Sequence, residues 1–288
     1  MANLRDIRRR IKSVKNTAQI TKAMQMVAAS KMRKAQEAAL NGRPYAELLN
    51  RVLVSLRDRV DPSVHPLLEK REVKNELVIL LSTDKGLCGA LNTNLFREVS
   101  NYDANTTQFV SIGRKGTQFL SRTKRKMIAD FELKDQPNFL ETKAISKFVI
   151  EKFLNGEVDR VTVLFPAFVN TLTQTPMAMT LLPITSVDEA GIKGKESPME
   201  LGGATVVFEP DAEGVLDDIL PYYVHFELFQ FLLGSRASEH SARMVAMKSA
   251  TDNAKQLVKD LTLEYNKARQ AAITKEILEI ATAQLALS

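Results

Sequence analysis

Apolar residues recur along the first forty residues at alternating steps of three and four. Nine of the eleven positions that follow this rhythm are apolar, and the two exceptions are Thr21 and Gln25. The eleven positions are Leu4, Ile7, Ile11, Val14, Ala18, Thr21, Gln25, Ala28, Met32, Ala35 and Ala39. Such steps place the side chains on one narrow stripe of an α-helix, which is typical of a coiled-coil seam. Small residues dominate the second half of the stripe, so a partner helix can approach closely. The pattern therefore predicts an N-terminal helix that packs against another helix.

The same rhythm returns near the other end of the chain. It runs through Met247, Ala250, Ala254, Leu257, Leu261, Tyr265, Ala268 and Ala272, and continues to Ile277 and Ile280. A helix from an N-cap at Asp211 to about Ala286, with a kink at Pro221, would rise roughly 110 Å at 1.5 Å per residue. A compact domain cannot enclose such a helix. We expect it to pair antiparallel with the first helix for part of its length and to project into something else.

Glycine and proline separate these helices from the middle of the chain. Prolines are absent from residues 1–43 and 222–288, and ten of the twelve glycines lie between Gly86 and Gly214. The exceptions are Gly42, which with Pro44 is expected to bend or interrupt the first helix, and Gly234. After Pro44 the first helix is expected to resume and to end near Asp61.

The middle alternates short apolar runs with amphipathic stretches. Strands are predicted at Glu76–Ser82, Gln108–Ile112, Lys126–Phe131, Arg160–Phe165 and Met177–Ile184, and helices at Leu91–Tyr102, Lys115–Arg122 and Phe139–Leu154. This order implies a largely parallel sheet with helices over its faces. Residues 186–203 are expected to form a loop, and Thr205–Phe208 a last strand.

The predicted fold class is therefore α/β: a long antiparallel coiled coil of the N- and C-terminal helices plus a central doubly wound, Rossmann-like domain. The predicted boundaries are 1–60 for the N-terminal helix, 73–209 for the central domain and 210–288 for the C-terminal helix.

The formal net charge of +6 is unevenly distributed. Residues 1–40 contain ten Lys or Arg and two acidic residues, which gives +8 there and leaves −2 for the rest of the chain. A helix this basic favours an anionic partner: nucleic acid, a lipid surface or an acidic protein surface. The chain has no Trp and only 6% aromatic residues, which disfavours a nucleic-acid-binding protein without removing that alternative.

Ser82–Asn94 reads STDKGLCGALNTN, follows a predicted strand and opens a predicted helix. Doubly wound folds bind phosphates at such a turn, so a nucleotide-binding enzyme is an alternative reading. The segment lacks three spaced glycines and a lysine-hydroxyl pair, which favours a tight turn with Cys88 packed inside. Asp84 and Lys85 are then turn residues with solvated charges.

No arrangement of residues indicates catalysis, a metal or a cofactor. Cys88 is the single cysteine, so an internal disulfide and a cysteine zinc site are excluded, and a reducing compartment suits the chain. His65, His225 and His240 are scattered without the spacing of metal ligands, and we expect them in the core or on the surface. The N-terminus has no apolar segment of a secretory signal, and organelle targeting is not expected.

At both ends the residues themselves, and not only their periodicity, resemble the gamma subunit of the F-type ATP synthase. The segments that carry the resemblance are Ile7–Gln36, Ser82–Asn94, Ala237–Ala254 and Leu261–Ile280. The middle from about 100 to 205 matches in organisation more than in wording. One departure is Thr282-Ala283-Gln284, where the family usually has Gly-Gly-Ala, which leaves the fine packing of the tip open.

The resemblance implies a bacterial central-stalk rotor that couples transmembrane proton flow to ATP synthesis and hydrolysis. The coiled coil would turn inside a hexamer of alpha and beta subunits, and the middle domain would sit on the membrane c ring beside the epsilon subunit, one copy per complex. It also implies that catalysis belongs to the hexamer, that the chain binds no cofactor or nucleic acid, and that it is peripheral on the cytoplasmic face of the bacterial inner membrane.

The resemblance further implies two sets of partner-contact residues. Contacts with acidic, mobile lower loops of beta are expected from Arg8, Arg9, Lys22, Met24, Met26, Arg33, Arg243, Gln256, Leu257 and Lys259. An apolar bearing near the top of the hexamer is expected around Ile273, Thr274, Glu276, Ile277 and Ile280.

Overall fold

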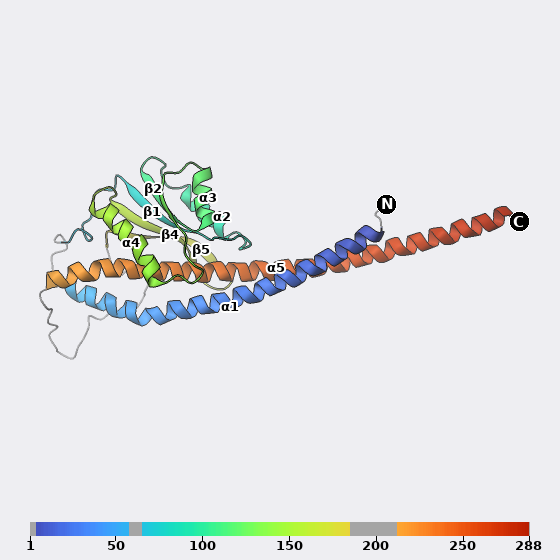
Figure 1. Ribbon diagram of the computed structural model, residues 1–288, viewed down its shortest axis with the longest axis horizontal. Coiled ribbons are helices and arrows are strands. Elements are labelled where there is room, and N and C mark those ends of the chain that lie inside the picture. Colours follow the sequence, from blue (N-terminus) through green and yellow to red (C-terminus); the bar gives the residue numbers. More distant parts are fainter. Residues whose placement is uncertain (1–3, 58–64, 185–211, 288) are drawn as a thin grey trace. The chain divides into compact units, whose positions relative to one another are not determined.

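The computed structural model describes residues 4–57, 65–184 and 212–287 (Figure 1). The chain divides into two compact units, which we call the helix-pair unit, Met1–Ala29 with Arg243–Ser288, and the α/β unit, Ser30–Ala242. The predicted loop 186–203, the predicted strand Thr205–Phe208 and the predicted N-cap Asp211 lie outside the described residues.

The two longest elements are α1, Leu4–Arg57, and α5, Ala212–Leu287. Helical backbone runs through Pro44 in α1 and through Pro221 in α5. Of the bend or interruption expected at Gly42 and Pro44, the interruption is therefore wrong. Proline removes one helical hydrogen bond and favours bending, but the buried Ala46 and Leu49 pack directly after it and keep the helix continuous.

In the helix-pair unit the start of α1 packs antiparallel against the end of α5. Thr21 and Thr251 share a buried hydrogen bond of 2.7 Å, and the Arg8 guanidinium lies 5.6 Å from the ring centre of Tyr265. The residue number thus rises on one helix as it falls on the other. The side chains buried along this seam are Ile7, Thr21, Ala28, Met247, Thr251, Ala254 and Leu261.

The phase of the seam on α5 differs from the prediction at two steps. Thr251 is buried and Val258 is half-buried, whereas Leu257 is 47% exposed. The seam therefore centres on 251 and 258, with Ala250 half-buried at its side and Leu257 outside it. Small or apolar residues occupy both members of each adjacent pair, so the spacing in the sequence could not separate them.

The α/β unit contains a five-stranded sheet in the order β3-β2-β1-β4-β5. Its strands are β1 Glu76–Leu81, β2 Thr107–Ile112, β3 Met127–Phe131, β4 Arg160–Phe168 and β5 Gln174–Leu182. Four strands are parallel, and β5 pairs antiparallel with β4 through a hairpin. The prediction of a largely parallel sheet is confirmed.

Three short helices complete the unit: α2 Leu91–Val99, α3 Arg114–Arg122 and α4 Phe139–Leu154. Alternate residues of β1 point to opposite faces, as a strand requires. Val78 and Leu80 pack in one cluster with residues of α2 and α3, and Leu77, Ile79 and Leu81 pack in the other with residues of α1, α4 and α5. Helices therefore cover both faces of the sheet, as a doubly wound fold predicts (Figure 1).

Candidate functional site

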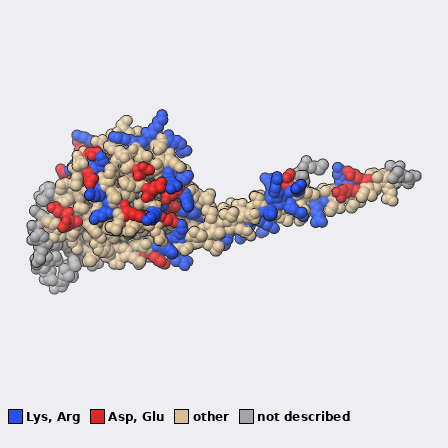
Figure 2. All heavy atoms as spheres, in the orientation of Figure 1, with Lys and Arg blue, Asp and Glu red and all other residues tan. Residues whose placement is uncertain are grey.

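The exposed surface of the helix-pair unit carries the excess positive charge of the N-terminus. Lys and Arg side chains gather on the first part of α1 in Figure 2. The seam buries Ile7, Thr21 and Ala28 of this helix, and its basic residues, among them Arg9 and Lys22, stay exposed. Arg9 forms a 3.2 Å ion pair with Asp6, but both side chains are largely in water, so the pair adds little stability. The surface suits an acidic partner.

The candidate contact residues lie at three levels along the helix pair. Thr21–Thr251 and Arg8–Tyr265 fix the register, so Lys22, Met24 and Met26 lie near the level of Met247. Gln256–Lys259 lie about ten residues along α5 from Met247, or roughly 15 Å at 1.5 Å per residue. Arg8 and Arg9 lie farther along, near the level of Tyr265.

The exposure of these residues varies with their place relative to the seam. Met24 and Arg243 are half-buried, whereas Met26, Leu257 and Lys259 are exposed. Arg33 lies in the α/β unit, so the structure does not group it with the residues of the helix-pair unit.

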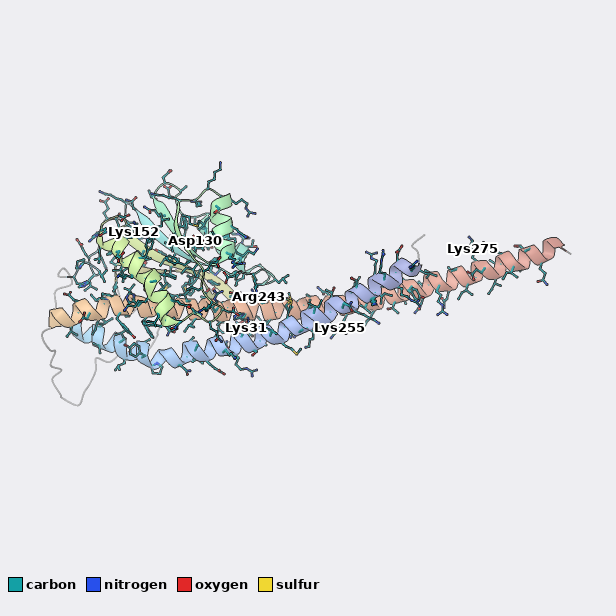
Figure 3. All side chains as sticks on the ribbon, viewed as in Figure 1. Lys31, Asp130, Lys152, Arg243, Lys255 and Lys275 are labelled. Atoms are coloured by element: carbon teal, nitrogen blue, oxygen red, sulfur yellow. The ribbon has the colours of Figure 1, made fainter. Side chains whose placement is uncertain are left out.

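The last part of α5, from Ile273 onward, exposes a run of apolar side chains. Ile273 is 43% exposed, Ile277 61% and Ile280 67%, and Leu278 is exposed as well. In the register set by Thr21 and Thr251, Leu4 of α1 lies level with about residue 268, so this end of α5 extends past the described start of α1. The side chains around Lys275 project from the helix in Figure 3. A run of exposed isoleucines on a helix is typical of a surface that an apolar partner covers.

The turn between β1 and α2 was the candidate phosphate site. The first three backbone N–H groups of α3 instead donate to this turn: Arg114 to Asp84 Oδ1 at 3.2 Å, Lys115 to the Thr83 carbonyl at 3.0 Å and Gly116 to Ser82 Oγ at 2.7 Å. Gly113, with φ 103°, permits this approach, because a Cβ there would lie 2.3 Å from the Ser82 carbonyl oxygen. The N-terminal N–H groups of α3 are therefore bonded within the fold, whereas the candidate phosphate turn opens α2, a separate helix end.

Cys88 is buried in this turn, as predicted. It lies in a small cluster with Leu91 and Ala242, and the Asn92 side-chain amide is 3.5 Å from its sulfur. Burial among apolar groups makes the thiol a packing residue.

Asp84 is not the solvated turn residue that the sequence suggested. Its Oδ2 lies 3.3 Å from Nη2 of Arg236 on α5, and the side chain of Arg236 is 5% exposed. The two residues are 152 positions apart, so local pattern carries no sign of the pair. The available signal was Arg236 itself, a charged residue on a face of α5 that also holds the buried Leu232 and Leu233.

The three histidines are buried, each beside a polar group. His225 Nδ1 lies 2.6 Å from Ser146 Oγ, His65 Nδ1 accepts from the Leu67 N–H at 3.1 Å, and His240 Nε2 lies 3.5 Å from Asp135 Oδ1. Burial lowers the pKa of His225 and His65. Among the described residues there is no cluster of His, Cys, Asp and Glu that could hold a metal ion. None of the helices in the described ranges is long and apolar enough to cross a bilayer.

The chain is similar to known proteins in family, sequence and structure. A family model described as ATP synthase matches residues 3–287. The chain is 52% identical over 292 residues to the ATP synthase gamma chain of Methylacidiphilum infernorum, covering 100% of both chains. It is 48% identical over 291 residues to the ATP synthase gamma chain of Akkermansia muciniphila, again covering 100% of both.

The fold is similar to solved structures of rotary assemblies. A chain in the central stalk and c-ring structure of the Tetrahymena thermophila mitochondrial ATP synthase aligns with a TM-score of 0.61 and 26% identity, covering 80% of this chain and 99% of that one. A chain in the Euglena gracilis mitochondrial ATP synthase rotor aligns with a TM-score of 0.63 and 19% identity, covering 94% and 98%, which shows a shared fold.

Proposed function

The chain belongs to the family of ATP synthase gamma chains, the central-stalk rotor subunits of the rotary ATP synthase, and from this premise we propose how its surfaces act in that machine. The helix-pair unit turns inside a hexamer of alpha and beta subunits. The α/β unit contacts the membrane c ring and the epsilon subunit. One copy serves each complex, at the cytoplasmic face of the bacterial inner membrane, and all catalytic sites belong to the hexamer.

The exposed isoleucines at the end of α5 are the observation that carries this proposal. A helix that exposes Ile273, Ile277 and Ile280 in water leaves a large apolar area uncovered. An apolar sleeve around the helix would cover that area while making few directional bonds, so the helix could rotate within it. The residues of the candidate bearing therefore suit a shaft end better than a fixed joint.

The polar surface lower on the helix pair suits a different task. The basic side chains of α1 and those near Lys255 on α5 would meet acidic loops of the beta subunits (Figure 3). Because the helix pair presents a different face in each direction, the three catalytic sites around it would meet different contacts. Such differential contacts bias each site toward a different nucleotide affinity, and rotation passes the bias from site to site.

Reconstitution tests the proposal. A mixture of alpha and beta subunits should gain ATPase activity when this chain is added, and vesicles that also contain the membrane sector should pump protons when ATP is supplied. Deleting residues 273–288 removes the candidate bearing and should lower both activities. An alpha-beta mixture that gains no ATPase with the full chain would contradict the proposal.

A further inference from the structure

One short stretch of α5, from Arg236 to Ser241, binds the turns that follow three different strands of the sheet. The contacts are polar and lie within the α/β unit. We propose that these residues form the torque-bearing joint through which the α/β unit grips α5, with Arg236 as its positioning residue. The inference rests on the rotor function proposed above.

Arg236 makes the first half of the joint. Its Nη1 donates to Glu239 Oε2 at 2.8 Å, and its Nη2 donates to Asp84 Oδ2 at 3.3 Å and to the Leu133 carbonyl at 3.4 Å. Asp84 follows β1 and Leu133 follows β3, so a single guanidinium joins two strand ends to the helix. Asp84 also accepts from the N–H of Arg114, the first residue of α3.

Asp135 makes the second half. It pairs with the Lys31 ammonium of α1, and its Oδ1 lies 3.5 Å from His240 Nε2 of α5. Burial alone would raise the pKa of this carboxyl, but Lys31, His240 and Arg236 together hold it below its ordinary value. The turn after β3 is thereby tied to both long helices.

Ser241 adds the hairpin between β4 and β5. Its hydroxyl donates to the Thr171 carbonyl at 2.8 Å and lies 3.4 Å from the Gln174 side-chain nitrogen. The turns after β1, β3 and β4 therefore meet α5 within six residues, less than two helical turns.

The physical reason for a polar joint lies in the direction of its bonds. Elsewhere in this unit α5 contributes Leu216, Leu220, Val224, Leu228 and Leu232 to the main apolar cluster. Apolar contact resists separation but is non-directional, so it opposes sliding and rotation only through shape. Ions that are hydrogen-bonded around a guanidinium only 5% exposed hold one geometry and cost much free energy when one partner is displaced. A helix that transmits torque needs such a fixed geometry at the place where the domain binds it.

Arg236→Met tests the joint, because methionine keeps much of the volume and removes the guanidinium. The control is Lys147→Met, which removes an ion pair with Glu151 on α4 whose side chains are 72% and 60% exposed. In the full-length chain, Arg236→Met should speed hydrogen exchange of the Arg114, Lys115 and Gly116 amides about 100-fold, because the turn that accepts their bonds loses its buried partner. Equal exchange in Arg236→Met and in the unchanged chain would overturn the inference.

The coupling measurement separates a joint from a merely structural residue. In vesicles with the whole ATP synthase, Arg236→Met should lose proton pumping per ATP hydrolysed while ATP hydrolysis continues, and Arg236→Lys should restore part of the loss. A structural defect alone would lower both activities in proportion and leave the ratio unchanged, which would overturn the inference.

If Arg236→Met does not assemble, Asp84→Asn keeps the shape and removes one charge, with the same expected drop in the ratio. Normal pumping per ATP in that variant also overturns it, whereas no pumping by the unsubstituted complex would instead sink the rotor function.

Discussion

The helix-pair unit and the α/β unit bury their apolar residues in different ways. In the helix pair, a single narrow seam with small side chains such as Ala28 and Ala254 is buried, and most other positions face water. In the α/β unit, two clusters of large side chains fill both faces of a sheet, and charged residues such as Arg236 and Glu227 are buried with them. The first unit leaves most of its surface in water around a narrow seam, whereas the second supplies its own core.

The largest expected effect comes from placing a charge on the half-buried face of the helix pair. Met24→Lys should uncouple rotation from synthesis, because a lysine there meets the partner surface with an extra charge that must be desolvated or paired. ATP-driven proton pumping in reconstituted vesicles measures the effect, and Met24→Leu serves as the control. Unchanged pumping by Met24→Lys would count against the contact assigned to Met24.

The same truncation should cost the two units different amounts of stability. Leu80→Ala removes a fully buried side chain between the sheet, α2 and α3, and should lower the free energy of unfolding by about 4 kcal/mol. Leu261→Ala sits in a two-helix seam that can close around the smaller side chain, and should cost about 1 to 2 kcal/mol. Hydrogen exchange resolved by peptide measures each unit separately. Equal costs would show that the seam is as tightly packed as the core.

Glu227 gives the α/β unit a pH dependence. Burial raises its pKa from 4.5 to about 7. The folded chain therefore holds a proton that the unfolded chain releases between pH 4.5 and 7, so stability falls as the pH rises through that window. Glu227→Gln should stabilise the chain at pH 8 by up to roughly 3 kcal/mol and change little at pH 4.

Urea unfolding at the two pH values checks this prediction, with the exposed Glu264→Gln on the same helix as control. A Glu227→Gln variant with the same gain at both pH values would show that the carboxyl is not the source of the pH dependence.

The smallest expected effect concerns the threonine pair of the seam. Thr251→Val removes a buried hydroxyl that bonds both Thr21 and the Met247 carbonyl, while Thr21 keeps a bond to the Ala18 carbonyl. The free energy of unfolding of the helix-pair unit should fall by about 1 kcal/mol, measured by hydrogen exchange of the amides along the seam. Thr262→Val, at an exposed position of α5, should cost almost nothing. A larger loss of stability in Thr262→Val than in Thr251→Val would contradict the assignment of Thr251 to the buried seam.

Periodicity predicted the long helices and the alternation of strands and helices, because both are recorded in local spacing. Helix α4 has the predicted bounds, whereas β5 begins at Gln174 and not at Met177. Its first residues pair with the end of β4 in a hairpin, and that pairing partner lies outside the local pattern. The prediction that Cys88 packs inside its turn is confirmed, and one of its neighbours there is Ala242 of α5, a partner that local spacing does not reveal.

The buried ion pairs could not be predicted. The partners Asp84 and Arg236 meet only after the sheet has formed and α5 has packed on it, and each lies in a segment that reads as ordinary turn or helix. The contact residues from Arg8 to Ile280 stay predictions, because their partners belong to other chains.

The most direct test of the account follows the exposed end of α5. Hydrogen exchange of residues 273–284 should be fast in the isolated chain and should slow strongly when the chain is assembled with alpha and beta subunits, while the sheet amides change little. That result would place the apolar end of α5 inside a partner. Equally fast exchange of this segment in an assembled, ATP-hydrolysing complex would contradict the central claim that it is the bearing of a rotor.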